Sequence, residues 1–138
     1  KIIVYGGFTL GKIRRHYKTI YPSSPISSRG ILAGNTLFIS GTTANKSDAA
    51  GGGAMQQLRV ILDRITRMVI AEGGQPSDIV RLTTYVTNID EWFPVEGEIV
   101  DLFTEFFGDQ KPTNAILEVT RLELPGLVVE IFEAFSIS

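Results

Sequence analysis

The stretch AMQQLRVILDRITRMVIAEGGQPSDIVRLTTYVTNI, residues 54–89, changes its hydrophobic period halfway and thereby decides the fold. In its first half, apolar residues recur at three- and four-residue steps, which predicts an amphipathic helix ended by Gly73 and Gly74. In its second half, from residue 79, β-branched and apolar residues are interspersed with Thr and Arg, which predicts a strand. A helix between two strands of one sheet requires a crossover, so we expect part of the sheet to be parallel.

The segments on either side supply the remaining elements. Residues 30–40 hold two apolar runs around Gly34 and Asn35, a pair typical of a tight hairpin turn. A second amphipathic helix is predicted from about Pro94 to a stop at Gly108. Four further segments are assigned by composition: an edge strand at 1–7, an irregular arm at 8–28, and strands at 113–122 and 127–137. The pattern predicts an α+β fold with both helices on one face of the sheet, the other face being left for a partner subunit.

Length, composition and charge limit the classes of function. A chain of 138 residues with 43% hydrophobic residues is expected to form one domain, with 1–26 as an N-terminal arm and 27–138 as its core. A net charge of −2 without a Lys/Arg run argues against nucleic acid or a membrane as partner. Cysteine is absent, which excludes disulfides and fits a cytoplasmic location.

The strongly diagnostic catalytic motifs are missing. The sequence holds no GxxxxGK[ST], HExxH or GxSxG pattern, and its one histidine, His16, lies in the irregular arm. One residue nevertheless stands out: Glu130 lies in VVEIF, where apolar neighbours would raise the pKa of a buried carboxyl group. The alternatives for Glu130 are a proton acceptor or donor in a site, and a solvent-facing position on a strand.

Three segments together carry a resemblance to a known family. SRGILAGNTLFISG is followed by a helix closing on EGGQPSDIVRLTTYVTNID, and then by FTEFFGDQKPTNAILEVTRLELPGLVVEI. The order and spacing of these segments resemble the Rid family, also known as YjgF-like proteins, over roughly residues 27–138. The resemblance implies a chorismate-mutase-like α+β fold, assembled as a homotrimer with sheets facing inward and metabolite-binding clefts between subunits.

The resemblance also implies a chemistry. The best-known members hydrolyse reactive enamines and imines without a metal or an organic cofactor. Glu130 falls on the family's water-holding glutamate, while the backbone of Gly41 and the position of Ile116 belong to the implied substrate site. Active deaminases clamp the substrate carboxylate with an arginine in a Pro-x-Arg pattern, since a guanidinium grips a carboxylate at two points.

This sequence departs from the family pattern at that arginine. Asn114 occupies the position, so the charged anchor is lost and ordinary 2-imino acids are doubtful substrates. Ser27 and Glu96 also stand at positions where members of the family frequently carry a tyrosine and an asparagine, respectively. Arg29 is a candidate substitute cation, because it lies two residues after Ser27 and should point to the same side; the alternative is a surface ion pair.

Three hypotheses for function follow. The first is a hydrolase of an enamine or imine other than the usual imino acids, in which Glu130 positions water while Asn114 and the Gly41 backbone polarise the reacting group. The second is a trimer that binds small metabolites without catalysis. The third is an endoribonuclease, an activity attributed to some relatives. The negative net charge of the chain does not favour it, because a nucleic-acid-binding surface is usually basic.

Overall fold

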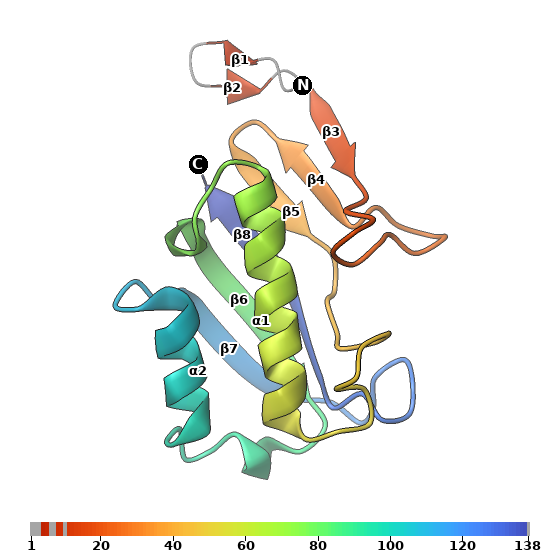
Figure 1. Cartoon of the computed structure of the whole chain (residues 1–138), viewed down its shortest axis with the longest axis vertical. Helices are drawn as coiled ribbons and strands as arrows, with labels where there is room; N and C mark the ends of the chain where they lie inside the picture. The colour runs from red at the N-terminus through yellow and green to blue at the C-terminus, as the bar shows by residue number, and fades with distance from the viewer. Residues whose placement is uncertain (1–3, 6–7, 10, 138) are drawn as a thin grey trace.

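The computed structural model describes residues 4–5, 8–9 and 11–137, and it places two helices against one face of a mixed sheet (Figure 1). The sheet has six strands in the order β3-β4-β5-β8-β6-β7. These strands are β3 (Lys12–Arg15), β4 (Gly30–Ala33), β5 (Thr36–Ile39), β6 (Ile79–Val86), β7 (Thr113–Glu118) and β8 (Val129–Ile137). The other elements are α1 (Ala54–Ala71), α2 (Glu98–Phe107), the 3-10 turns Pro76–Asp78 and Ile89–Glu91, and a ribbon of β1 (Val4–Tyr5) and β2 (Phe8–Thr9).

The crossover expected from the sequence is present. Strands β6 and β7 pair in parallel and are connected through α2, whereas β6 pairs with β8 in the antiparallel direction. The predicted hairpin is also confirmed, with β4 and β5 joined by a turn in which Gly34 has a φ of 63°. That left-handed conformation suits glycine because it has no Cβ. The α+β fold class is therefore as predicted.

The core lies between the helices and the sheet. The stripe predicted on α1 is buried, with Leu58, Leu62 and Ile65 fully shielded from solvent. From the sheet, Leu82 of β6 and Ile131 of β8 contribute to the same apolar cluster. Shielding such side chains from water is the main stabilising contribution to a domain of this size.

Several boundary predictions were wrong, among them the end of the strand predicted at 113–122, which as β7 ends at Glu118. Residues 12–15 of the predicted irregular arm form the edge strand β3, which pairs with β4 and is held to the end of α1 by the Arg15–Glu72 ion pair at 3.1 Å. The second helix begins at Glu98 instead of Pro94, because Gly97 has a φ of 71°, which a right-handed helix excludes. Of the strand predicted at 1–7, residues 1–3 and 6–7 lie outside the described residues.

The first turn of α1 anchors the loop that leads into β8. Gln57 is completely buried, and its side-chain nitrogen donates to the carbonyl oxygens of Gly52 at 3.0 Å and Gly126 at 2.7 Å. Its side-chain oxygen accepts a hydrogen bond from the backbone N–H of Val128 at 3.0 Å. One amide thereby connects two loops that are far apart in the sequence.

The face of the sheet away from the helices carries aromatic side chains. Phe38 is 46% exposed and meets Phe135 edge to face, with ring centroids 5.3 Å apart. Farther along the same face, Tyr85 stacks on Phe132 with centroids 4.6 Å apart. No helix among the described residues is long and apolar enough to cross a membrane.

Candidate functional site

Glu130 is surrounded by a small polar cluster at the junction of β8 and the loop after β5. We name Glu130, Gly41, Arg29 and Glu123 the Glu130 corner. A Cβ atom at position 41 would overlap the Glu130 carboxylate, so the carboxylate lies directly against the Gly41 backbone. The absence of a Cβ at Gly41 permits this close approach, and an added methyl group would require the end of the Glu130 side chain to move.

The surroundings of Glu130 change its acidity. Partial burial is the largest effect, and together with the negative charge of Glu123 and a hydrogen bond between the two side chains it raises the pKa of Glu130 to about 7. The positive charge of Arg29 opposes this shift. Near neutral pH the side chain is therefore present in both protonation states, as a general acid or base requires.

Arg29 is the cation of this corner, and it is not a surface residue. Its side chain is only 6% exposed, and its guanidinium donates to the carbonyl oxygen of Gly41 and, at 3.4 Å, to that of Pro22. The guanidinium carbon lies 4.4 Å from the ring centroid of Tyr21. Burial lowers the pKa of Arg29, and its Nε is buried without a hydrogen-bond partner among the described residues. The surface ion pair considered for Arg29 is therefore wrong.

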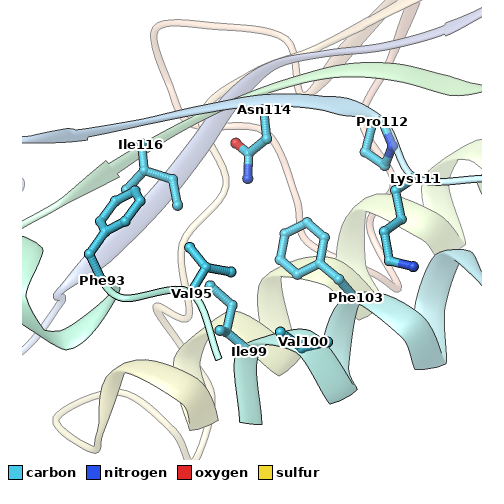
Figure 2. Close-up of a pocket in the computed structure, with 9 residues that line it drawn as sticks. All are labelled: Phe93, Val95, Ile99, Val100, Phe103, Lys111, Pro112, Asn114 and Ile116. Carbon is cyan, nitrogen blue, oxygen red and sulfur yellow. The ribbon is translucent and has the colours of Figure 1, made fainter. Parts of the chain in front are cut away.

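A groove between β7 and α2 forms a second region, which we name the Asn114 groove. It encloses about 370 Å³ and is shown in Figure 2. The residues that line it are Phe93, Val95, Ile99, Val100, Phe103, Lys111, Pro112, Asn114 and Ile116. A concave region of this size with few polar groups is typical of a small-molecule site.

The side chain of Asn114 has a defined orientation in the groove. The hydroxyl of Thr84, on the neighbouring strand β6, donates to the Asn114 Oδ1 at 2.9 Å. Because its oxygen accepts this bond, the amide nitrogen is directed into the groove (Figure 2). Asn114 thus offers hydrogen-bond donors to a ligand.

The two regions lie on opposite faces of the sheet within one chain. Asn114 is paired in register with Leu82 and shares the face covered by the helices. Glu130 is paired with Tyr85 on the opposite face. Side chains alternate between faces along a strand, so Glu130 and Asn114 do not meet within one chain.

The structure separates the residues proposed from the sequence into three groups. Glu130, Gly41 and Arg29 form the corner, and Asn114 and Ile116 line the groove. Ser27 and Glu96 are exposed and lie in neither region; the Ser27 hydroxyl is 2.9 Å from that of Ser24. No group of three or more His, Cys, Asp or Glu residues that could hold a metal occurs in the part of the chain that the structure describes.

Sequence reasoning missed several residues of these regions. Glu123 was not identified as a site residue, although it interacts with Glu130. Phe93 lines the groove, whereas its neighbour Trp92 is 2% exposed and belongs to the core. Thr84 carries no recognisable motif, and only the register of β6 against β7 reveals that it orients Asn114.

Both regions lie within the part of the chain that is similar to known proteins. The family described as Endoribonuclease L-PSP matches residues 17–135. A RutC family protein of Pyrococcus horikoshii is 29% identical over 104 residues, covering 73% of this chain and 79% of the relative. TdcF of Escherichia coli, named as a candidate reactive intermediate deaminase, is 23% identical over 99 residues, covering 68% of this chain and 74% of TdcF.

A solved structure gives the same result in three dimensions. The crystal structure of a member of the YjgF/YER057c/UK114 family from Mycobacterium tuberculosis aligns with a TM-score of 0.73 at 30% identity. The alignment covers 93% of this chain and 100% of that chain. The strands and helices that carry the Glu130 corner and the Asn114 groove are thus part of the shared fold.

Proposed function

Because the chain belongs to the Endoribonuclease L-PSP family, which includes the Rid or YjgF-like proteins, we propose that it is a cofactor-independent hydrolase of enamine or imine metabolites. The substrate differs from the usual small 2-imino acids, since Asn114 stands where the active deaminases carry arginine. The observation that supports this proposal most strongly is the half-buried Glu130, with a pKa of about 7, against the backbone of Gly41.

The proposed reaction uses Glu130 to move protons. The carboxylate takes a proton from water as the water oxygen bonds to the imine carbon, and the C=N electron pair is protonated at nitrogen. Glu130 then takes the proton of the new hydroxyl group and donates it to the amine nitrogen, so that the C–N bond breaks, ammonia leaves and a C=O group remains. A pKa near ambient pH favours each of these transfers because both the acid and the base form of Glu130 are available.

The proposal includes a homotrimer that brings the two regions together between subunits. Within one chain the Glu130 corner and the Asn114 groove face opposite sides of the sheet. The aromatic face that includes Phe38, 46% exposed, is an apolar surface of the kind that a second copy covers. The Glu130 corner of one subunit then lies opposite the Asn114 groove of another, and the substrate binds between them.

The test is turnover of freshly generated 2-iminopropionate by the wild type, Asn114→Arg, and Asn114→Arg with Glu130→Gln, compared at equal trimer content. We expect slow turnover by the wild type and faster turnover by Asn114→Arg, because the arginine restores a charged anchor. Adding Glu130→Gln is expected to lower the rate about a hundredfold or more. Equal rates with and without Glu130→Gln, or no turnover by any variant, would contradict the proposal.

A second candidate is a trimer that binds metabolites without catalysis. The mainly apolar lining of the Asn114 groove favours this candidate, since such a lining holds a ligand but contributes no reacting group. A binding protein would retain its ligand affinity in Glu130→Gln and would show no turnover in any background. The same set of variants therefore separates the two candidates.

A further inference from the structure

Glu123 lies on a loop that is exposed to solvent but held in place. The loop between β7 and β8 lines a hollow of about 570 Å³, and Glu123 is one of the exposed residues that border it. The buried amide of Gln57 donates to the carbonyl oxygen of Gly126 at 2.7 Å, and the N–H of Gly51 donates to the same oxygen at 3.2 Å. Leu127 of the same loop is buried. Glu123 therefore has a defined position although water reaches its side chain.

The side chains of Glu123 and Glu130 are joined by a hydrogen bond. An ionised carboxylate has only acceptor oxygens, so a hydrogen bond between two carboxyl groups requires a proton on one of them. Because Glu130 is half-buried and Glu123 is exposed, the proton is favoured on Glu130 and the negative charge on Glu123. The two residues thus hold one proton and one charge between them.

The other groups around Glu130 are consistent with one shared proton. Arg29, just before β4, is the cation that acts on Glu130, and it acts on Glu123 as well. Arg64 of α1 acts on Arg29, and on β6 the neighbour of Glu130 in register is Tyr85. Two ionised carboxylates would leave an excess negative charge beside one guanidinium. A pair that keeps one proton carries a single negative charge, which the charge of Arg29 balances.

We propose that Glu123 is a positioning residue for Glu130: the two carboxyl groups hold one proton between them, and the pair keeps Glu130 available as both acid and base. Glu130 exchanges each proton with the substrate, while Glu123 accepts a hydrogen bond from Glu130 whenever Glu130 is protonated. The pair gains and loses no proton over one turnover. Its part in hydrolysis rests on the proposed function, whereas the sharing of the proton does not.

The first test is an NMR titration of the full chain with isotope-labelled glutamate, in which the Glu130 carboxyl signal is assigned by its absence in Glu130→Gln. We expect a midpoint of about 7 in the wild type. In Glu123→Gln it should fall by about one pH unit or more, because glutamine is uncharged and its amide donates to the ionised Glu130. Glu91→Gln removes an exposed carboxylate outside the corner and is the matched control. An unchanged midpoint in Glu123→Gln, or an equal shift in Glu91→Gln, would overturn the proposal.

A kinetic test distinguishes failure of this inference from failure of the proposed function. Hydrolysis of 2-iminopropionate is measured against pH in Asn114→Arg, alone and with Glu123→Gln or Glu123→Asp added. Glu123→Gln should lower the rate at neutral pH about three- to tenfold and move the alkaline fall of the profile to lower pH, and Glu123→Asp should restore both. A shifted NMR midpoint without hydrolysis in any variant would support the proton-sharing pair and contradict the hydrolase. Hydrolysis with a pH profile that Glu123→Gln does not change would contradict the pair and support the hydrolase.

Discussion

The Glu130 corner and the Asn114 groove occupy opposite faces of one sheet and are held in place by different forces. In the corner, the Glu130 carboxylate lies against the Gly41 backbone, and Arg29 donates hydrogen bonds to the main-chain oxygens of Gly41 and Pro22. In the groove, hydrocarbon side chains of α2 and β7 surround one amide that a single hydroxyl orients.

Because of this difference, the two regions should differ in the substitutions that they tolerate. A polar cluster in a partly buried place depends on each of its contacts, because an unpaired group there is costly. An apolar wall accepts exchanges of similar volume at little cost. The Glu130 corner is therefore expected to tolerate fewer substitutions than the Asn114 groove.

Of three further changes, the largest effect is expected from Gly41→Ala, which alters the Glu130 corner. The added methyl group overlaps the Glu130 carboxylate and displaces it, so we expect turnover to fall about ten- to a hundredfold. The measurement is the rate of imine hydrolysis at saturating substrate. Gly53→Ala is the matched control, because a Cβ there meets no atom within 4 Å. Equal rates in the two variants would show that the corner is not confined in the way we describe.

An intermediate effect is expected on the stability of Glu130→Gln. Folding raises the pKa of Glu130 from 4.5 to about 7, so its contribution to stability falls as pH rises through that window. At pH 8 the variant should be more stable than the wild type by ~1–2 kcal/mol after allowance for solvent screening, with the difference vanishing near pH 4. Urea unfolding at both pH values measures this, with the exposed Glu91→Gln as control. A variant less stable than the wild type at pH 8 would contradict the assigned acidity.

The smallest effect is expected from Thr84→Val at the Asn114 groove. Valine keeps the shape but removes the donor, so the Asn114 amide loses its fixed orientation. Turnover of 2-iminopropionate should fall about two- to fivefold, in line with one neutral hydrogen bond. Thr83→Val changes the adjacent residue on the other face and provides the comparison. Identical rates in the two variants would mean that the Thr84 hydrogen bond does not determine the orientation of the Asn114 amide.

Much of the fold could be predicted from the sequence, because periodic burial leaves a periodic pattern. The apolar stripe of α1 and the β-branched composition of β6 were sufficient to predict a strand-helix-strand unit, although the parallel pair in the structure, β6 with β7, is joined through α2. Strand β3 was missed because the sequence KIRR is dominated by charges, which are common on an edge strand and resemble a loop. The start of α2 was placed too early because Pro94 is a good helix start, whereas Gly97 sets the observed boundary.

The candidate site was less predictable than the fold. Glu130 attracted attention as an acid among apolar neighbours, and the structure shows it half-buried with a raised pKa. The burial of Arg29 depends on Tyr21, and the acidity of Glu130 depends on Glu123; both partners come from segments without periodicity. The separation of Glu130 from Asn114 depends on strand register, which a single sequence does not encode locally.

The buried amide of Gln57 has a consequence for heat tolerance. It connects the loop before α1 to the loop before β8, and the latter loop includes Glu123 of the Glu130 corner. Loops open locally at a lower free energy than a core does. On warming, release of this one amide would loosen the surroundings of Glu130 while the helices and sheet remain folded. Loss of activity is therefore expected to precede melting of the chain.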